Sequence, residues 1–82
     1  MPVSSAQRER IVGKVDTGEL MCGRPMKMYA GYGTGLRCAA CAGVITPTNI
    51  EYEMHFGGGT TYRMHWNCVG AWQSECERRG QR

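Results

Sequence analysis

The most regular alternation of apolar and polar residues in this chain runs from Ile50 to Met64. Apolar side chains at positions 52, 54 and 56 alternate with polar ones at 51, 53 and 55, and glycines 57–59 separate them from a second segment, 60–64. A period of two residues is typical of strands that bury one face. The pattern therefore predicts a β-hairpin.

The length of the glycine turn fixes the register of this hairpin. A three-residue turn places Met54 opposite Tyr62 and Glu53 opposite Arg63, so that apolar and charged side chains lie on separate faces. A four-residue turn would place Met54 opposite Arg63 and mix the two faces. Because a slip of one residue moves every side chain to the other face, we predict the three-residue turn.

Helical spacing appears near both ends of the chain. Ser4 and Gln7 have the spacing of a capping box and Gly18 is a stop signal, so we predict an N-terminal helix over residues 5–16. Apolar positions 68, 69, 72 and 76 fall on one side of a second helix, predicted over 65–79. Trp72 is expected in the core of the domain, and Glu75 on the polar side of this helix.

The segment from Met21 to Leu36 has no clear period. Pro25 and the glycine-rich run 31–35 indicate a loop across the domain, with at most a short extended piece at 26–29. The glycine run lacks the lysine that follows in a P-loop and does not join a strand to a helix. We therefore do not predict a phosphate site there.

Two pairs of metal-ligating residue types carry the chemistry of this chain. Two residues separate Cys38 from Cys41 and two separate His65 from Cys68, with 23 residues between the pairs. Such spacing directs both side chains of a pair at one ion, and zinc prefers four sulfur and nitrogen ligands in a tetrahedron. We predict one structural zinc ion, since four protein ligands leave no position for a catalytic water. Gly43 is expected to supply the positive φ of the first turn.

The order of these elements predicts an α+β, treble-clef-like domain stabilised by zinc. It consists of an N-terminal helix, a long loop, a zinc knuckle, a β-hairpin and a C-terminal helix. We expect a single domain over residues 1–82, with a zinc core at 36–79 and frayed ends at 1–4 and 80–82. A chain of 82 residues buries only about 60–65% of its surface, so reinforcement by a metal is expected.

The metal-ligand spacing and several short runs resemble known proteins. The spacing resembles the first zinc half of LIM domains, although no second Cys-x2-Cys pair follows Cys68. Further runs are Gly18-Glu19-Leu20, Gly33-Thr34-Gly35, Ile45-Thr46-Pro47, Glu51-Tyr52-Glu53 and His65 to Trp72. With these runs, the chain from about Ile11 to Glu75 resembles small uncharacterised bacterial zinc-finger-like proteins. That resemblance implies a zinc site and no assigned activity.

The remaining cysteines bear on the compartment. The chain shows no basic and apolar leader and no apolar run long enough to cross a bilayer, so we expect a reducing cytoplasm and no membrane partner. Cysteines there hold metal more often than they form disulfides, and an odd count of five agrees. We interpret Cys22 as a packing or free thiol, Cys76 as a small buried residue and His55 as a surface histidine.

Charge and aromatic content leave two kinds of partner open. The formal charge of +3 falls to about +2 when three thiolates bind zinc, too small to require nucleic acid. The leading hypothesis is a non-enzymatic module that binds another protein. The alternative is a nucleic-acid-binding zinc finger that uses the acid-free segment 21–50. The candidate partner-binding residues in that segment are Arg24, Lys27, Tyr29, Tyr32 and Arg37.

HNH-type nucleases are the one class of enzyme that we compare with this sequence. HNH-type nucleases also use a treble clef, but they need an open metal site with catalytic histidines. His65 belongs to the predicted closed site and His55 is the only other histidine. We therefore expect no enzymatic activity. The sequence does not define the oligomeric state.

Overall fold

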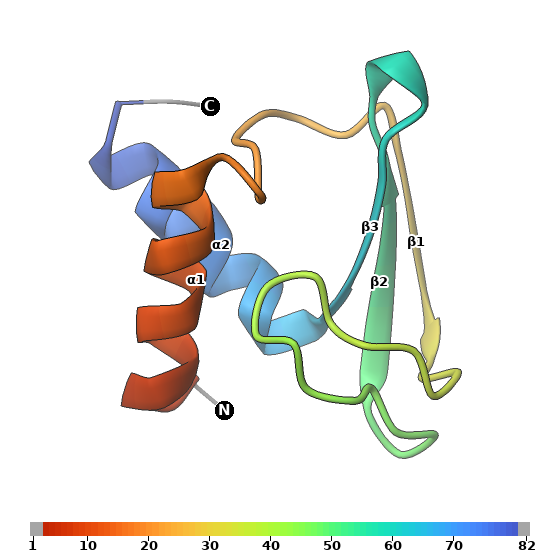
Figure 1. Ribbon diagram of the computed structural model, residues 1–82. Helices are drawn as coiled ribbons and strands as arrows, with labels where there is room; N and C mark the ends of the chain where they lie inside the picture. The colour runs from red at the N-terminus through yellow and green to blue at the C-terminus, as the bar shows by residue number, and fades with distance from the viewer. Residues whose placement is uncertain (1–2, 81–82) are drawn as a thin grey trace.

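A computed structural model describes residues 3–80 and shows a small α+β fold of two helices and a three-stranded antiparallel sheet. The elements are α1 (Ser5–Thr17), β1 (Lys27–Tyr32), β2 (Ile50–His55), the single 3-10 turn η1 (Gly57–Gly59), β3 (Thr61–His65) and α2 (Trp66–Arg78). Both helices lie on the same side of the sheet, and β3 leads directly into α2 (Figure 1). The chain between β1 and β2 forms loops at that end of the sheet.

The predicted capping residue Ser4 and stop residue Gly18 lie at the two ends of α1. The Ser4 N–H donates to Gln7 Oε1 at 2.9 Å, and the Gln7 N–H donates to Ser4 Oγ at 3.2 Å, which is a complete capping box. Gly18 has φ of +81° and ends the helix. The helix buries Ile11, and Val3 packs against the core. Residues 1–2 and 81–82 of the predicted frayed ends lie outside the described residues.

The hairpin has the predicted register. Met54 lies opposite Tyr62 and Glu53 opposite Arg63, and the Phe56 N–H donates to the Thr60 carbonyl at 2.8 Å across the glycine turn. Met54 is fully buried beneath the helices, as an alternating strand requires. The prediction from periodicity is confirmed here because one face of the hairpin is truly covered.

The loop predicted over residues 21–36 contains a longer strand than the short extended piece expected at 26–29. Residues 27–32 form β1, which pairs antiparallel with β2 so that Lys27 lies opposite His55 and Tyr32 opposite Ile50. All six residues of β1 are exposed. A strand held by its backbone alone has no buried face, and therefore no apolar–polar period that the sequence could reveal.

The core lies between the sheet and the two helices. Met54 and Met64 from the sheet and Ile11 from α1 meet Trp72 from α2, and all four are nearly inaccessible. Trp72 also stands edge-on to the rings of Phe56 and Tyr62, with centroids 6.0 and 6.4 Å away. Other buried apolar residues are Leu20, Ala40, Ile45, Val69 and Ala71. The expectation that Trp72 is a core residue is confirmed.

The placement of Glu75 on a polar helix face was wrong. Its side chain is buried, and α1 packs against α2. Arg78 and Arg79 donate to the Glu75 carboxylate, and Arg79 also donates to Asp16 of α1 at 2.6 Å. The hydrogen bonds from Arg78, and then those from Arg79, lower the pKa of Glu75 to about 2. Glu75 is therefore part of the ionic contact that joins the two helices.

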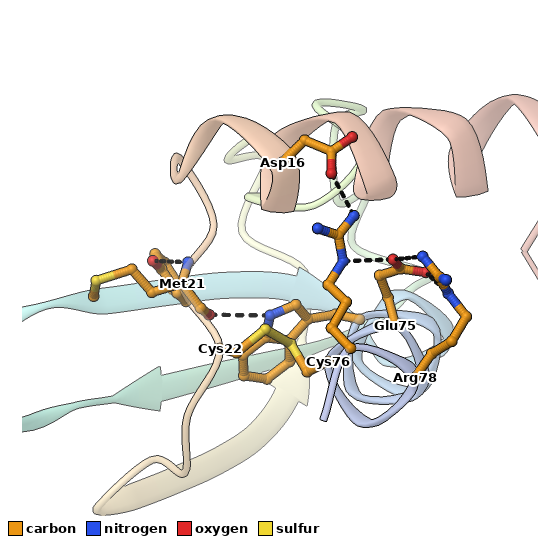
Figure 2. Close-up of a disulfide and its surroundings, with 9 residues drawn as sticks. Asp16, Met21, Cys22, Glu75, Cys76 and Arg78 are labelled. Atoms are coloured by element: carbon orange, nitrogen blue, oxygen red, sulfur yellow. Dashed lines mark hydrogen bonds and ion pairs between the residues drawn. A yellow bond between two sulfur atoms is a disulfide. The ribbon is translucent and has the colours of Figure 1, made fainter. Parts of the chain in front are cut away.

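Cys22 and Cys76 are not free thiols, because they form a disulfide (Figure 2). Cys76 is buried in the core and Cys22 packs against it, as expected. Their Cα atoms lie 5.6 Å apart although 54 positions separate them in sequence. Trp72 Nε1 donates to the Met21 carbonyl at 3.1 Å, and the Met21 N–H donates to Tyr62 Oη at 2.9 Å. These bonds hold the loop after α1 against α2 and bring the two sulfurs together. Five cysteines thus divide into three beside His65 and one bridged pair.

Candidate metal centre

The first cysteine pair lies in a tight turn, residues 38–43, which we call the knuckle turn. The Ala42 N–H donates to the Cys38 carbonyl at 2.9 Å, and the Cys38 N–H donates to the Gly43 carbonyl at 2.8 Å. The Cys41 N–H points at Cys38 Sγ, 3.5 Å away. A backbone N–H directed at a sulfur stabilises its thiolate form, which is the form that binds metals.

The second pair lies where β3 ends and α2 begins. His65 is the last residue of β3 and caps α2, and Cys68 is in the first turn of that helix. The Ala39 N–H donates to the Arg63 carbonyl at 2.7 Å, which fixes the knuckle turn to the outer edge of β3. β3 and α2 together position His65 and Cys68 next to the first cysteine pair.

The imidazole of His65 is oriented for metal binding. Its Nε2 lies 3.1 Å from the Val44 carbonyl oxygen, which only accepts hydrogen bonds, so Nε2 carries the hydrogen. In the neutral ring, Nδ1 then has its lone pair free. Nδ1 lies 3.5 Å from Cys41 Sγ and 3.9 Å from Cys68 Sγ. A backbone carbonyl on the far ring nitrogen is the usual way in which proteins orient a metal-binding histidine.

The four predicted ligands converge. The sulfur atoms of Cys38, Cys41 and Cys68 and a ring nitrogen of His65 all lie within 4.8 Å of one another. The three cysteines are buried and His65 is partly buried. A tetrahedral ion with bonds of about 2.0–2.3 Å keeps its ligand atoms about 3.3–3.8 Å apart, so small shifts suffice to close this cluster on one ion. The group could therefore hold a metal ion.

The protonation of the thiols points the same way. A hydrogen bond from Cys68 lowers the pKa of Cys38 to about 4. The same contact, followed by burial, raises the pKa of Cys68 well above its usual range. Three thiols this close resist a second negative charge, so all of them ionise only if a cation lies among them.

Three cationic side chains surround the knuckle turn, and sequence reasoning missed two of them. Arg10 donates to the Cys41 carbonyl at 3.1 Å and Lys14 to the Ala39 carbonyl at 3.1 Å, both from α1. Arg37 donates to the Ala42 carbonyl at 2.9 Å. Three thiolates, one imidazole and a divalent ion carry a net charge of −1, which these cations offset. The only sequence feature that could have indicated these two contacts is the i, i+4 spacing of Arg10 and Lys14. The same spacing is equally common on solvent-exposed helix faces.

The expected role of Gly43 was also wrong. The positive φ of the knuckle turn lies at Ala42, with φ of +66°. A Cβ atom at Gly43 would lie 3.4 Å from Cys41 Sγ and 3.8 Å from a ring carbon of His65. Gly43 thus leaves space beside the ligands and does not provide the unusual backbone conformation.

The five candidate partner-binding residues are all exposed, but they do not gather on one surface. Lys27 and Tyr29 lie on the face of the sheet that carries Glu53 and His55, because residues opposite one another across strands share a face. Tyr32 lies on the other face, with Ile50. Arg24 precedes β1, and Arg37 is bonded to the knuckle turn. Segment 21–50 contains no acidic residue, but β2 places Glu53 on the same face of the sheet as Lys27 and Tyr29.

His55 takes part in a polar network on the same outer face. Its Nε2 contacts Glu53 at 2.6 Å and its Nδ1 contacts Thr61 Oγ1 at 3.3 Å. The interaction with His55, with a further contribution from Arg63, lowers the pKa of Glu53. The side chain of His55 is 38% exposed, as expected of a surface histidine.

No protein-family model, no curated protein and no solved structure matches this chain. The resemblance to bacterial zinc-finger-like proteins therefore remains a prediction, and the function is argued from the site alone. No helix between residues 3 and 80 combines the length and apolar character that a membrane span requires.

Proposed function

We propose that Cys38, Cys41, His65 and Cys68 bind one structural zinc ion, and that the domain is a non-enzymatic interaction module of the treble-clef type. The observation that carries the proposal is the convergence of the four ligand atoms within 4.8 Å, although they come from two distant segments. The order of knuckle turn, hairpin and helix agrees with a treble clef.

The donor set favours zinc over other metals. Three thiolates and one imidazole in a tetrahedron suit zinc, whereas calcium and magnesium prefer oxygen ligands. Four protein ligands complete the coordination of zinc and leave no position for a water or a substrate. A structural role follows, with Arg10 and Lys14 linking the site to α1.

The interaction part of the proposal is supported by the surface around β1. Met26 is 77% exposed, Tyr32 74% and Leu36 48%. Met28, which lies between Met26 and Tyr32 in sequence, is 41% exposed, so exposed apolar side chains recur along the length of β1. A series of exposed apolar side chains on a small domain commonly marks a binding surface. The nucleic-acid alternative has no comparable support, because a charge of about +2 attracts phosphates weakly at physiological salt.

Metal content in matched cysteine variants tests the zinc assignment. The purified chain should carry one zinc ion by native mass spectrometry. Cys38→Ser, Cys41→Ser and Cys68→Ser should each lose it, since a neutral hydroxyl replaces a thiolate ligand. The double variant Cys22→Ser/Cys76→Ser is the control and should keep one zinc. Zinc retained in Cys38→Ser but lost in that control would show that the ligand set is wrong.

A further inference from the structure

The outer edge of β1 carries unpaired backbone groups. The Gly33 N–H donates to the Asn49 carbonyl at 3.0 Å, which continues the ladder between β1 and β2. Antiparallel pairing alternates along a strand, so Met28, Ala30 and Tyr32 turn their N–H and C=O groups away from β2. Within residues 3–80 no hydrogen bond reaches these groups from the outer side. The other edge of the sheet, β3, is bonded to the knuckle turn.

This edge lacks the features that usually prevent strand pairing. β1 contains no proline, and its only charged residue, Lys27, stands at one end. Met28 and Tyr32 share a face with the buried side of β2, yet they are 41% and 74% exposed because α2 packs on β2 and β3. Backbone groups and apolar side chains are therefore available together along one edge.

We propose that β1 pairs antiparallel with β1 of a second copy of this chain, about a two-fold axis at Ala30. This inference rests on the proposed interaction role and names its partner. In this register Ala30 faces Ala30 of the second copy and Met28 faces its Tyr32. All three outward-facing residues of both strands then bond one another. If the register shifted by two residues, one of the three outward-facing residues on each strand would lose its hydrogen-bonding partner.

The side chains and charges of β1 are complementary to themselves in that register. Met28 meets Tyr32 of the second copy, a favourable sulfur–aromatic contact, on both sides of the axis. Tyr29 lies across from Gly31 and can cover it. Lys27 lies opposite the neutral Gly33, and the two lysines are about 20 Å apart, beyond the screening length of about 8 Å. Because like charges do not meet, a second copy fits this edge, in the two-fold arrangement most common among oligomers.

The contact is small, which sets the expected affinity. Two six-residue strands with their flanking side chains fall at the low end of protein interfaces, below about 1,200 Å². We therefore expect a reversible dimer with a dissociation constant in the micromolar range.

Charge variants at the axis test both the dimer and its register. Ala30 is exposed, so a charged residue there is tolerated in the monomer. Ala30→Lys and Ala30→Glu each place like charges opposite one another at the axis, whereas their equimolar mixture places opposite charges there. Sedimentation equilibrium of the zinc-loaded proteins should show that each variant alone associates on the order of tenfold more weakly than the mixture. Ser74→Lys, which adds the same charge on the exposed side of α2, should dimerise like the natural chain.

Amide hydrogen exchange provides a second readout. The N–H groups of Met28, Ala30 and Tyr32 should exchange more slowly as protein concentration rises, since only these face the second copy. Those of Tyr29 and Gly31 should not change. Zinc content is measured on every sample, so loss of the metal site is distinguished from loss of the dimer.

Two results would overturn the proposal. A zinc-loaded natural chain that stays monomeric up to about 1 mM would exclude self-pairing, and would leave a strand of another protein as the occupant of this edge. A dimer that persists equally in Ala30→Lys, or an equimolar mixture that associates no better than its components, would place the interface elsewhere.

Discussion

Ala42 and Gly33 show how single backbone positions constrain the two loop segments that lie between β1 and β2. Ala42 adopts a left-handed conformation, which costs a residue with a side chain about 1–2 kcal/mol. Ala42 adopts this conformation as part of the knuckle turn, which brings Cys38 and Cys41 together. Gly33 meets a different constraint, since its Cα lies against the backbone of Thr46. This close approach explains why residue 33 is a glycine, without a phosphate-binding role for the glycine-rich run 31–35.

Replacing Gly33 by alanine should destabilise the domain. The new Cβ atom would stand 2.1 Å from the Thr46 carbonyl oxygen and 2.6 Å from that of Ile45, so the backbone must move. Overpacking of this kind costs about 1–3 kcal/mol. Chemical denaturation of Gly33→Ala and of Gly31→Ala measures it. Gly31 has nothing within 4 Å of its Cβ position, and equal stabilities of the two variants would argue against the close approach.

Glu75 should make stability depend on pH. Arg78 and Arg79 hold its pKa at about 2 in the folded protein, below the ordinary value of 4.5. The folded state therefore gains stability above pH 4.5 and loses this gain as the pH falls toward 2. The difference in denaturation midpoint between the natural chain and Glu75→Gln should stay constant near neutral pH and shrink below about 4.5.

Comparing these two chains removes the effect of acid on the thiol ligands, which they share. Glu77→Gln, an exposed change on the same helix, serves as the control and should differ little from the natural chain. A difference for Glu75→Gln that does not vary with pH would show that the carboxylate charge is not what matters at this position.

At the scale of elements, separate contacts hold the parts of this small fold together. Arg10 and Lys14 of α1 bind carbonyls of the knuckle turn, and Arg79, the residue that follows α2, binds Asp16 of α1. The Cys22–Cys76 disulfide ties the loop after α1 to α2, in the same region as Asp16 and Glu75 (Figure 2). No cysteine belongs to both the candidate metal cluster and the disulfide, although Cys68 and Cys76 share α2, so removal of one need not remove the other.

The disulfide should contribute to stability without being needed for metal binding. Closing a loop of this length restricts the unfolded chain by about 4 kcal/mol in the entropic model. Because the metal ligands already cross-link residues inside that loop, we expect about 2–4 kcal/mol from denaturation of Cys22→Ser/Cys76→Ser against the oxidised natural chain. Reduction of the natural chain should reproduce this loss. Unchanged stability in both cases would indicate that the two cysteines do not pair in solution.

At the scale of the whole molecule, the apolar core is too small to be the only source of stability. The buried side chains form one cluster, and three of its members are the ligand cysteines Cys38, Cys41 and Cys68. Domains of this size bury a limited share of their surface and commonly depend on cross-links. The candidate metal site lies within the core, so we expect metal binding to be coupled to folding.

Removal of zinc should therefore unfold most of the domain. Structural zinc supplies about 10–16 kcal/mol in finger-like peptides, more than the usual net stability of a small domain. Titration with a chelator, followed by the near-ultraviolet circular dichroism of Trp72 and its aromatic neighbours, should show loss of packing that added zinc restores. A metal-free chain that keeps this signal and unfolds cooperatively would contradict the coupling.

The sequence by itself determined the features that depend on local spacing. The capping box at Ser4, the hairpin register around Met54 and the two pairs of candidate metal ligands all follow from residues a few positions apart. Such spacings fix direction and face before any distant contact forms. The α+β class and the core position of Trp72 follow from the same patterns.

Only the tertiary structure decided which distant segments meet. β1 forms because β2 offers a free edge to an exposed segment without periodicity, and Cys22 pairs with Cys76 because Trp72 and Tyr62 hold the loop at Met21. Glu75 is buried because Arg78 and Arg79 pair with its carboxylate, and Arg79 also bonds Asp16 of α1. Backbone pairing, disulfide formation and ion pairing depend on distance in space, which the spacing of residues along a chain does not encode.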